Sequence, residues 1–173
     1  MTLETGIIFQ LRVFSQEGQE FRRIKEHWGT IPAMDPYWLS RFVTAQERDY
    51  DRALAEIRRG RKTSHWMWYV FPQFRGLGHS AMSEMYAVGS LDEARAYLAH
   101  PVLGPRLVEC AEAVLAVSGR SATEIFGWPD DMKLQSSATL FAAASAPASV
   151  FHRILDQYYD GRHDTRTMDL LPS

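Results

Sequence analysis

The stretch that decides the fold is Lys62-Thr63-Ser64-His65-Trp66-Met67-Trp68-Tyr69-Val70-Phe71-Pro72-Gln73. It gathers two tryptophans, a tyrosine and a phenylalanine around one histidine, one lysine and one glutamine. This density of aromatic and polar types indicates either the wall of a pocket or the centre of a core. The sequence leaves both interpretations open and specifies no reaction.

The aromatic block is expected to contain a short helix. Ser64 is a natural N-cap, and Pro72 keeps the preceding residue out of helical geometry. The sequence therefore predicts a helix over about residues 65–70, apolar all round and buried on several sides. A strand paired with residues 6–14 is the alternative, and a lone strand pair is marginal. The side chains we expect in the core are Trp66, Met67, Trp68 and Phe71.

Composition fits one globular domain. The chain has 173 residues, of which 46% are hydrophobic and 23% charged, enough to close a core without cross-links. A net charge of -2 and a pI near 6.3 disfavour nucleic acid as a partner, although Arg58, Arg59, Arg61 and Lys62 form a local basic cluster. No apolar run can span a bilayer and no signal peptide is evident, so we expect a soluble, cytoplasmic protein with no membrane partner.

Metal and cofactor sites are not expected. The single Cys110 lies on an apolar helix face, which indicates a small buried hydrophobe in a reducing compartment. The six histidines show no paired ligand spacing, and one cysteine cannot complete a thiolate site. The predicted metal and cofactor complement is therefore none.

Helix signals recur from Asp35 onward. Asp35 suits an N-cap and Pro36 a first helical position, but the pattern over residues 36–59 leaves open one helix or two. Ser90 to Glu93 and Ser121 to Glu124 match the capping box. Further helices are predicted over residues 81–88, 106–117, 130–144 and 150–159, with a last turn capped by Asp164. About seven or eight helices form an all-α domain.

The pattern of apolar and polar residues in residues 1–33 differs from that of the remainder of the chain. They mix partial strand-like alternation with helical spacing and form no clear element. Met34 then precedes a fresh helix start, so we predict that Met34 is the natural first residue. On this hypothesis the chain divides into an N-terminal extension, residues 1–33, and a helical domain, residues 34–173.

Two polar clusters hold the candidate site residues. In the first cluster, His65 is either a general acid or base or a histidine that bonds a backbone carbonyl. Lys62 either binds a phosphate or carboxylate or is simply solvated. Gln73 either orients a ligand or holds its loop in place. In the second, Asp131 is a ligand residue or a helix cap. Lys133 with Ser136 and Ser137 forms an activated hydroxyl, or else the two small serines simply permit close helix packing. The fragment Gly76-Leu77-Gly78 follows no strand and does not predict a dinucleotide site.

From about Asp35 to Leu171, the chain resembles a family of bacterial helical proteins known as domain of unknown function 1810. Some members of that family are labelled calpastatin. The motifs are Arg41 to Gln46, Gly60 to Lys62, His65 to Gln73, Gly76 to Gly78, Ser90 to Ala94, His100 to Gly104, and Asp131, Lys133, Ser136, Ser137 and Thr139 to Phe141. The resemblance implies an all-helical fold and a start near Met34, and carries no established activity. The calpastatin label implies protease inhibition, but that inhibitor is a disordered repeat protein, unlike this chain.

Two functional hypotheses follow. The first is a site for a small anionic or nucleotide-like ligand. Its reason is that an unpaired charge within an apolar helix costs free energy unless it serves a function. Its walls would be Trp66, Trp68 and Tyr69, and its polar lining Lys62, His65, Gln73, Asp131, Lys133 and Ser137. The alternative is a non-catalytic domain that contacts another, unspecified protein. In that case the clusters are paired internally, for instance Asp131 with Lys62 or Lys133.

Overall fold

The computed structural model describes residues 35–172, and all of the regular elements in that range are helices. They are α2 (Ser40–Arg58), α3 (Met67–Val70), α4 (Ala81–Met85), α5 (Leu91–Ala99), α6 (Leu103–Leu115), α7 (Ala122–Phe126), α8 (Asp130–Ala144), α9 (Val150–Tyr159) and α10 (Thr165–Leu170). An isolated bridge joins Phe74 to Val88. The predicted all-α class is confirmed, while the predictions made for residues 1–33 lie outside the described residues.

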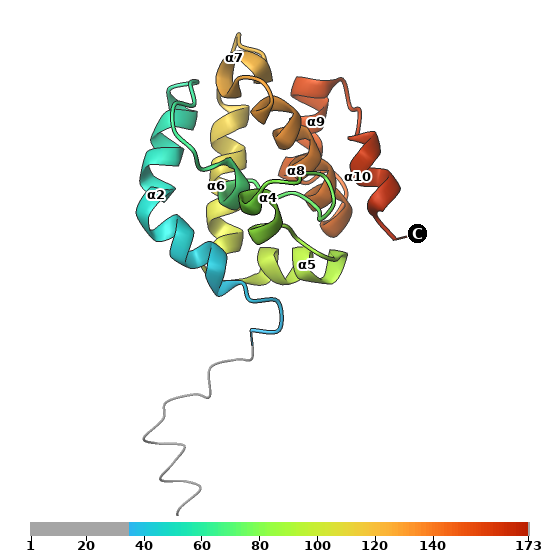
Figure 1. Cartoon of the computed structure of the whole chain (residues 1–173). Coiled ribbons are helices and arrows are strands. Elements are labelled where there is room, and N and C mark those ends of the chain that lie inside the picture. The colour runs from blue at the N-terminus through green and yellow to red at the C-terminus, as the bar shows by residue number, and fades with distance from the viewer. Residues whose placement is uncertain (1–34, 173) are drawn as a thin grey trace, which may run out of the picture. The chain divides into compact units, whose positions relative to one another are not determined.

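Two helices organise the domain. Helix α6 contacts α2, α5 and α9, and helix α8 contacts α5, α7, α9 and α10. In Figure 1, α6 lies between α2 and the pair α8 and α9, with α10 beyond them. None of the described helices combines the length and apolarity needed to cross a bilayer.

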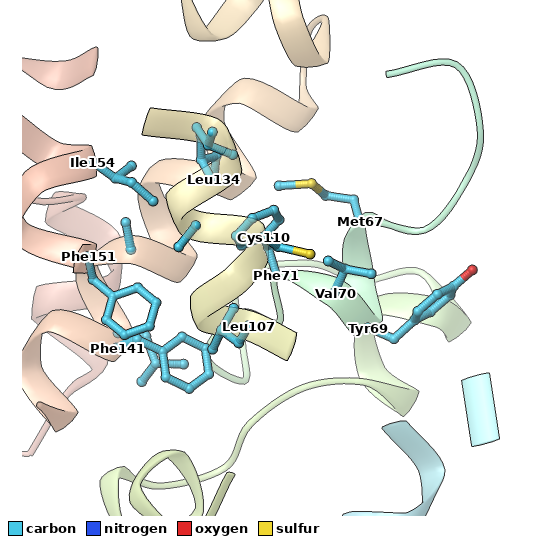
Figure 2. Close-up of a cluster of buried hydrophobic side chains, with 14 of the residues drawn as sticks. Met67, Tyr69, Val70, Phe71, Leu107, Cys110, Leu134, Phe141, Phe151 and Ile154 are labelled. Carbon is cyan, nitrogen blue, oxygen red and sulfur yellow. The ribbon is translucent and has the colours of Figure 1, made fainter. Parts of the chain in front are cut away.

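A row of aromatic rings runs through the core. Phe42 of α2 meets Tyr97 of α5 edge to face at 5.1 Å between ring centroids, and Tyr97 lies 5.4 Å from Phe141 of α8. The ring centroids of Phe141 and Phe151 of α9 are 5.4 Å apart, and Figure 2 shows the two side chains next to each other. Such pairs add about 0.5–1.5 kcal/mol each beyond the area they bury. Four helices are thus joined through one row of rings.

Cys110 is part of the same core. Its side chain is fully buried on α6, and Figure 2 shows it among the apolar side chains. Burial is the main cause that raises the pKa of its thiol to about 12. The prediction of a small buried hydrophobe is confirmed.

The start of α2 was predicted wrongly. The helix begins at Ser40 after an N-cap at Leu39, and Trp38 has a positive φ of 51°, so Asp35 and Pro36 do not open it. The Arg41 guanidinium donates to the carbonyls of Tyr37 and Trp38, which fixes this turn ahead of the helix. From Ser40 onward α2 is one continuous helix of 19 residues, which answers the open question of one or two.

Several other helix ends were predicted correctly, but the helix predicted over residues 81–88 ends at Met85, and the one predicted over residues 106–117 spans Leu103–Leu115. Ser121 and Glu124 form the full capping box of α7, Gly127 ends that helix with φ 74°, and Asp164 caps α10. The second box is only half formed: Ser90 accepts from the Glu93 amide, but the Glu93 carboxylate bonds elsewhere. It accepts from the Gly89 amide and from Arg41, both at 2.7 Å, because the buried guanidinium needs a counterion.

The aromatic block forms a shorter helix than expected. Helix α3 begins at Met67, and the N-cap is Trp66 rather than Ser64. Phe71 leaves helical geometry with φ -120° and ψ 73°, as its following proline predicts. Trp66, Met67 and Phe71 are buried in the core, which confirms that prediction. Trp68 is only partly buried, so its assignment to the core was wrong.

Candidate functional site

A caged carboxylate holds the start of the aromatic block. Glu56, 2% exposed on α2, accepts from the backbone amides of Thr63 and Ser64 at 2.8 and 3.1 Å. It also accepts from the hydroxyls of both residues, at 2.7 and 2.8 Å, and from the indole Nε1 of Trp66 at 2.8 Å. None of these five donors, all within the described residues, is a cation. Because the Ser64 hydroxyl bonds Glu56, it does not cap α3.

The cage keeps Glu56 ionised. Burial alone would raise the pKa of its carboxyl, but the hydrogen bonds from Thr63, Trp66 and Ser64 outweigh it and lower the pKa to about 2. No expectation drawn from the sequence singled out this residue, because a charged side chain on an amphipathic helix usually faces solvent. Because every donor around Glu56 is already engaged, this end of the block is built for stability.

The other end of the block meets the second polar cluster. The Asp130 carboxylate bonds two ammonium groups, Lys62 Nζ through Oδ2 and Lys133 Nζ through Oδ1, both at 2.6 Å. Lys62 Nζ lies 5.2 Å from the ring centroid of Trp66, and Lys133 Nζ lies 4.6 Å from that of Trp68. The two clusters predicted from sequence therefore do meet in space.

Two cations share one anion in this cluster. Burial tends to raise the pKa of Asp130, but the hydrogen bonds from Lys133 and Lys62 dominate and lower it, so the carboxyl is ionised at neutral pH. The lysine side chains are only 8% and 21% exposed, and Asp130 is 16% exposed. An ionised carboxylate balances one ammonium, which leaves one excess positive charge beside the aromatic faces.

A cavity of about 320 Å³ opens next to this cluster. We call it the Trp68 cavity, and its lining residues are Trp68, Gln73, Leu77, Gly78, His79, Ser80, Ser83, Pro129, Met132, Lys133, Ser136, Asp164 and Arg166. They come from α3 and the loop that follows it, from α4, and from the starts of α8 and α10. The volume is at the low end of the range of about 300–1,000 Å³ for small-molecule sites.

The loop that frames the cavity requires its two glycines. Gly76 has φ +95°, a conformation that side chains other than glycine rarely adopt. At Gly78, a Cβ atom would lie 2.7 Å from the Ser83 side chain, so the loop can approach α4 only without one. The two glycines of the motif are thus explained by backbone geometry, without a phosphate.

Three predicted site residues line the Trp68 cavity, namely Trp68, Gln73 and Lys133. Lys62 reaches the site only through Asp130. The side chain of His65 is exposed and does not line the cavity. Trp66 and Tyr69 are buried and do not form its walls.

The two other predicted residues of α8 lie away from the cavity lining. Asp131 accepts from the Thr123 hydroxyl at 2.5 Å and from the Met132 amide at 2.8 Å. It is not the lysine partner that the sequence analysis suggested; that partner is the neighbouring Asp130. The Ser137 hydroxyl is 1% exposed, and within residues 35–172 it has no hydrogen-bond partner.

The sequence analysis missed two residues of the site. Asp130 was treated only as part of a helix start. Arg166 lines the cavity from α10 and donates to the Leu77 carbonyl at 3.5 Å, 89 residues away in sequence. No local pattern marks such a long-range contact. Among residues 35–172, no group of three histidine, cysteine, aspartate or glutamate side chains can hold a metal ion.

Comparisons with known proteins agree with this fold. The model of a family described as "Protein of unknown function (DUF1810)" matches residues 36–171. A crystal structure of the conserved hypothetical protein Rv1873 from Mycobacterium tuberculosis is 54% identical, with a TM-score of 0.78. The match covers 79% of this chain and 98% of that one. Among curated proteins, none matches the chain.

Proposed function

The chain belongs to the DUF1810 family, and we propose that it binds a small anionic, nucleotide-like ligand in the Trp68 cavity. The observation that carries the proposal is that Trp68 and Gln73, from one segment, line the same cavity as Lys133 and Arg166. An aromatic face, an amide and two cations are the groups that bind a heterocyclic base and a phosphate.

The charges of the cavity favour an anion. Lys133 and Arg166 contribute two positive charges to the lining, against one negative charge from Asp164. The Asp164 carboxylate already accepts from the amide and hydroxyl of Thr167, at 2.9 and 2.5 Å. Within the described residues, no carboxylate pairs with Arg166, so its guanidinium is available to an incoming anion.

Thermal-shift measurements test the proposal with AMP and ribose 5-phosphate, using adenosine as the neutral counterpart. A ligand that binds only the folded state stabilises it by RT ln(1 + [L]/Kd), so the melting temperature rises with the concentration of a ligand that binds. We expect the phosphates to stabilise the protein and adenosine to do so far less. The proposal fails if neither phosphate changes the melting temperature.

Variants locate the binding site. Lys133→Gln and Arg166→Gln should weaken AMP binding at least about tenfold, because each removes a charge-assisted contact. The matched control is Arg95→Gln on α5, where the arginine is exposed and paired with Asp92. His65→Ala should leave AMP binding unchanged, because His65 does not line the cavity. Equal effects of Arg95→Gln and Arg166→Gln would exclude this site.

A second candidate function rests on the internal pairing of the cluster. Because Asp130 engages both Lys62 and Lys133, the polar groups can be explained as a structural lock in a domain that contacts another protein. This alternative gains support if Asp130→Asn and Lys62→Met lower stability while no anion binds the unmodified protein.

A further inference from the structure

The Trp68 cavity has a neighbour with a different lining. A second cavity of about 380 Å³, which we call the Tyr158 cavity, is lined by residues of α8, the end of α9 and the turn into α10. Asp164 and Arg166 line both cavities, so the two adjoin at these side chains.

The linings of the two cavities are complementary. Apolar and aromatic groups, including Trp68, Leu77 and Met132, contribute to the Trp68 cavity. The Tyr158 cavity is lined instead by polar groups, among them Gln135 and Arg162. An apolar wall suits a heterocyclic base, whereas a wall of polar donors suits a sugar or a second anionic group.

Arg166 occupies the junction. Arg166 is exposed, and within the described residues its guanidinium donates one long hydrogen bond, to the Leu77 carbonyl at 3.5 Å. A planar guanidinium with five donors binds phosphate oxygens in pairs. Placed between the two cavities, it suits the anionic linker of a two-part ligand.

Arg162 supplies a second cation to the Tyr158 cavity, and it does not line the Trp68 cavity. It pairs with Asp160 at 2.9 Å, but both side chains are largely exposed, at 75% and 87%, where such pairs are weak. The Tyr158 and Tyr159 hydroxyls, by contrast, already donate to backbone carbonyls of Val114 and Asp131. The groups open to a ligand in this cavity are thus chiefly the arginines.

We infer that the two cavities together bind a nucleoside diphosphate joined to a sugar. The base lies against Trp68, the diphosphate at Lys133 and Arg166, and the sugar in the Tyr158 cavity beside Arg162. This inference rests on the proposed function, since it extends the same site beyond Arg166.

Calorimetric titration of AMP, ADP and ADP-glucose into the full chain tests the inference. ADP-glucose should bind at least about tenfold more tightly than AMP, because it alone fills both cavities. Arg162→Gln should remove at least about half of that gain while AMP binds as before. Arg153→Gln on α9 is the matched control, because Arg153 is exposed and paired with Glu112 outside both cavities.

The outcomes separate the two claims. If AMP, ADP and ADP-glucose all fail to bind, the proposed function and the inference fall together. If AMP binds but ADP-glucose binds no more tightly, or if Arg162→Gln acts like Arg153→Gln, the inference alone is wrong. Melting temperatures of the variants show whether each one remains folded.

Discussion

The two tryptophans of the aromatic block, two residues apart, have opposite surroundings. Trp66 is 1% exposed and donates its indole N–H to the caged Glu56. Trp68 is only partly buried, lies under the Lys133 ammonium and lines a cavity. At the Trp66 end, neutral donors saturate the Glu56 carboxylate, which is a structural arrangement. At the Trp68 end, one carboxylate, Asp130, faces two ammonium groups and leaves one positive charge unbalanced, and this is the end at which we propose that a ligand binds.

The largest expected effect is at the Glu56 end. Glu56→Gln should lower the free energy of unfolding by about 3 kcal/mol, because the amide turns an acceptor into a donor that faces buried donors. Glu47→Gln, exposed on the same helix, is the control. Urea unfolding measures both. Equal stabilities of the two variants would show that the cage does not hold the block.

The same carboxylate predicts a dependence of stability on pH. The pKa of Glu56 in the folded protein is about 2, below its ordinary value of 4.5. Its contribution is therefore complete above pH 4.5 and is lost as the pH falls through 2. The difference in unfolding free energy between the unmodified protein and Glu56→Gln should shrink as the pH falls from 6 toward 3. A difference that stays constant over this range would contradict the low pKa.

At the Trp68 end of the block, Asp130→Asn should lower stability less than Glu56→Gln does, and it should strengthen the binding of AMP. We expect a loss of about 1–3 kcal/mol, because Lys62 and Lys133 lose a partly buried counterion. AMP should bind more tightly to this variant, since one negative charge beside the cavity is gone. Asp131→Asn is the control, because that carboxylate bonds neither lysine. If both variants behave alike, the assignment of Asp130 is wrong.

The smallest effect is expected at Ser137. Ser137→Ala should change the unfolding free energy by less than about 0.5 kcal/mol, because the buried hydroxyl loses no hydrogen bond. Ser136→Ala, which removes a 3.1 Å bond to the Met132 carbonyl, is the comparison and should cost slightly more. A large loss at Ser137 would reveal a partner for its hydroxyl.

Helix ends whose capping bonds join residues close in sequence were predictable. The Ser121 capping box and the Asp164 cap were both found, since each bond lies within one turn. Glu56 was missed because its donors follow 7 to 10 residues later, beyond a helix end. Charged residues at such positions usually face solvent.

The candidate site was predicted in part for the same reason. Sequence composition pointed to Trp68, Gln73 and Lys133, because polar groups within apolar segments stand out. From the sequence we chose Asp131, whereas the lysine partner is Asp130. Neighbours on a helix differ by about 100° in direction, and only packing decides which of them faces the lysines. Arg166 depends on where α10 docks against α8, which no local pattern encodes.

The different roles of Trp66 and Trp68 can be tested by an NMR titration of their indole N–H signals with AMP. Trp66→Phe and Trp68→Phe identify the two signals among the five tryptophans. The account predicts that the Trp68 signal shifts progressively with AMP, while the Trp66 signal stays at the position set by Glu56. A Trp68 signal that does not move, or a Trp66 signal that moves as much, would contradict it.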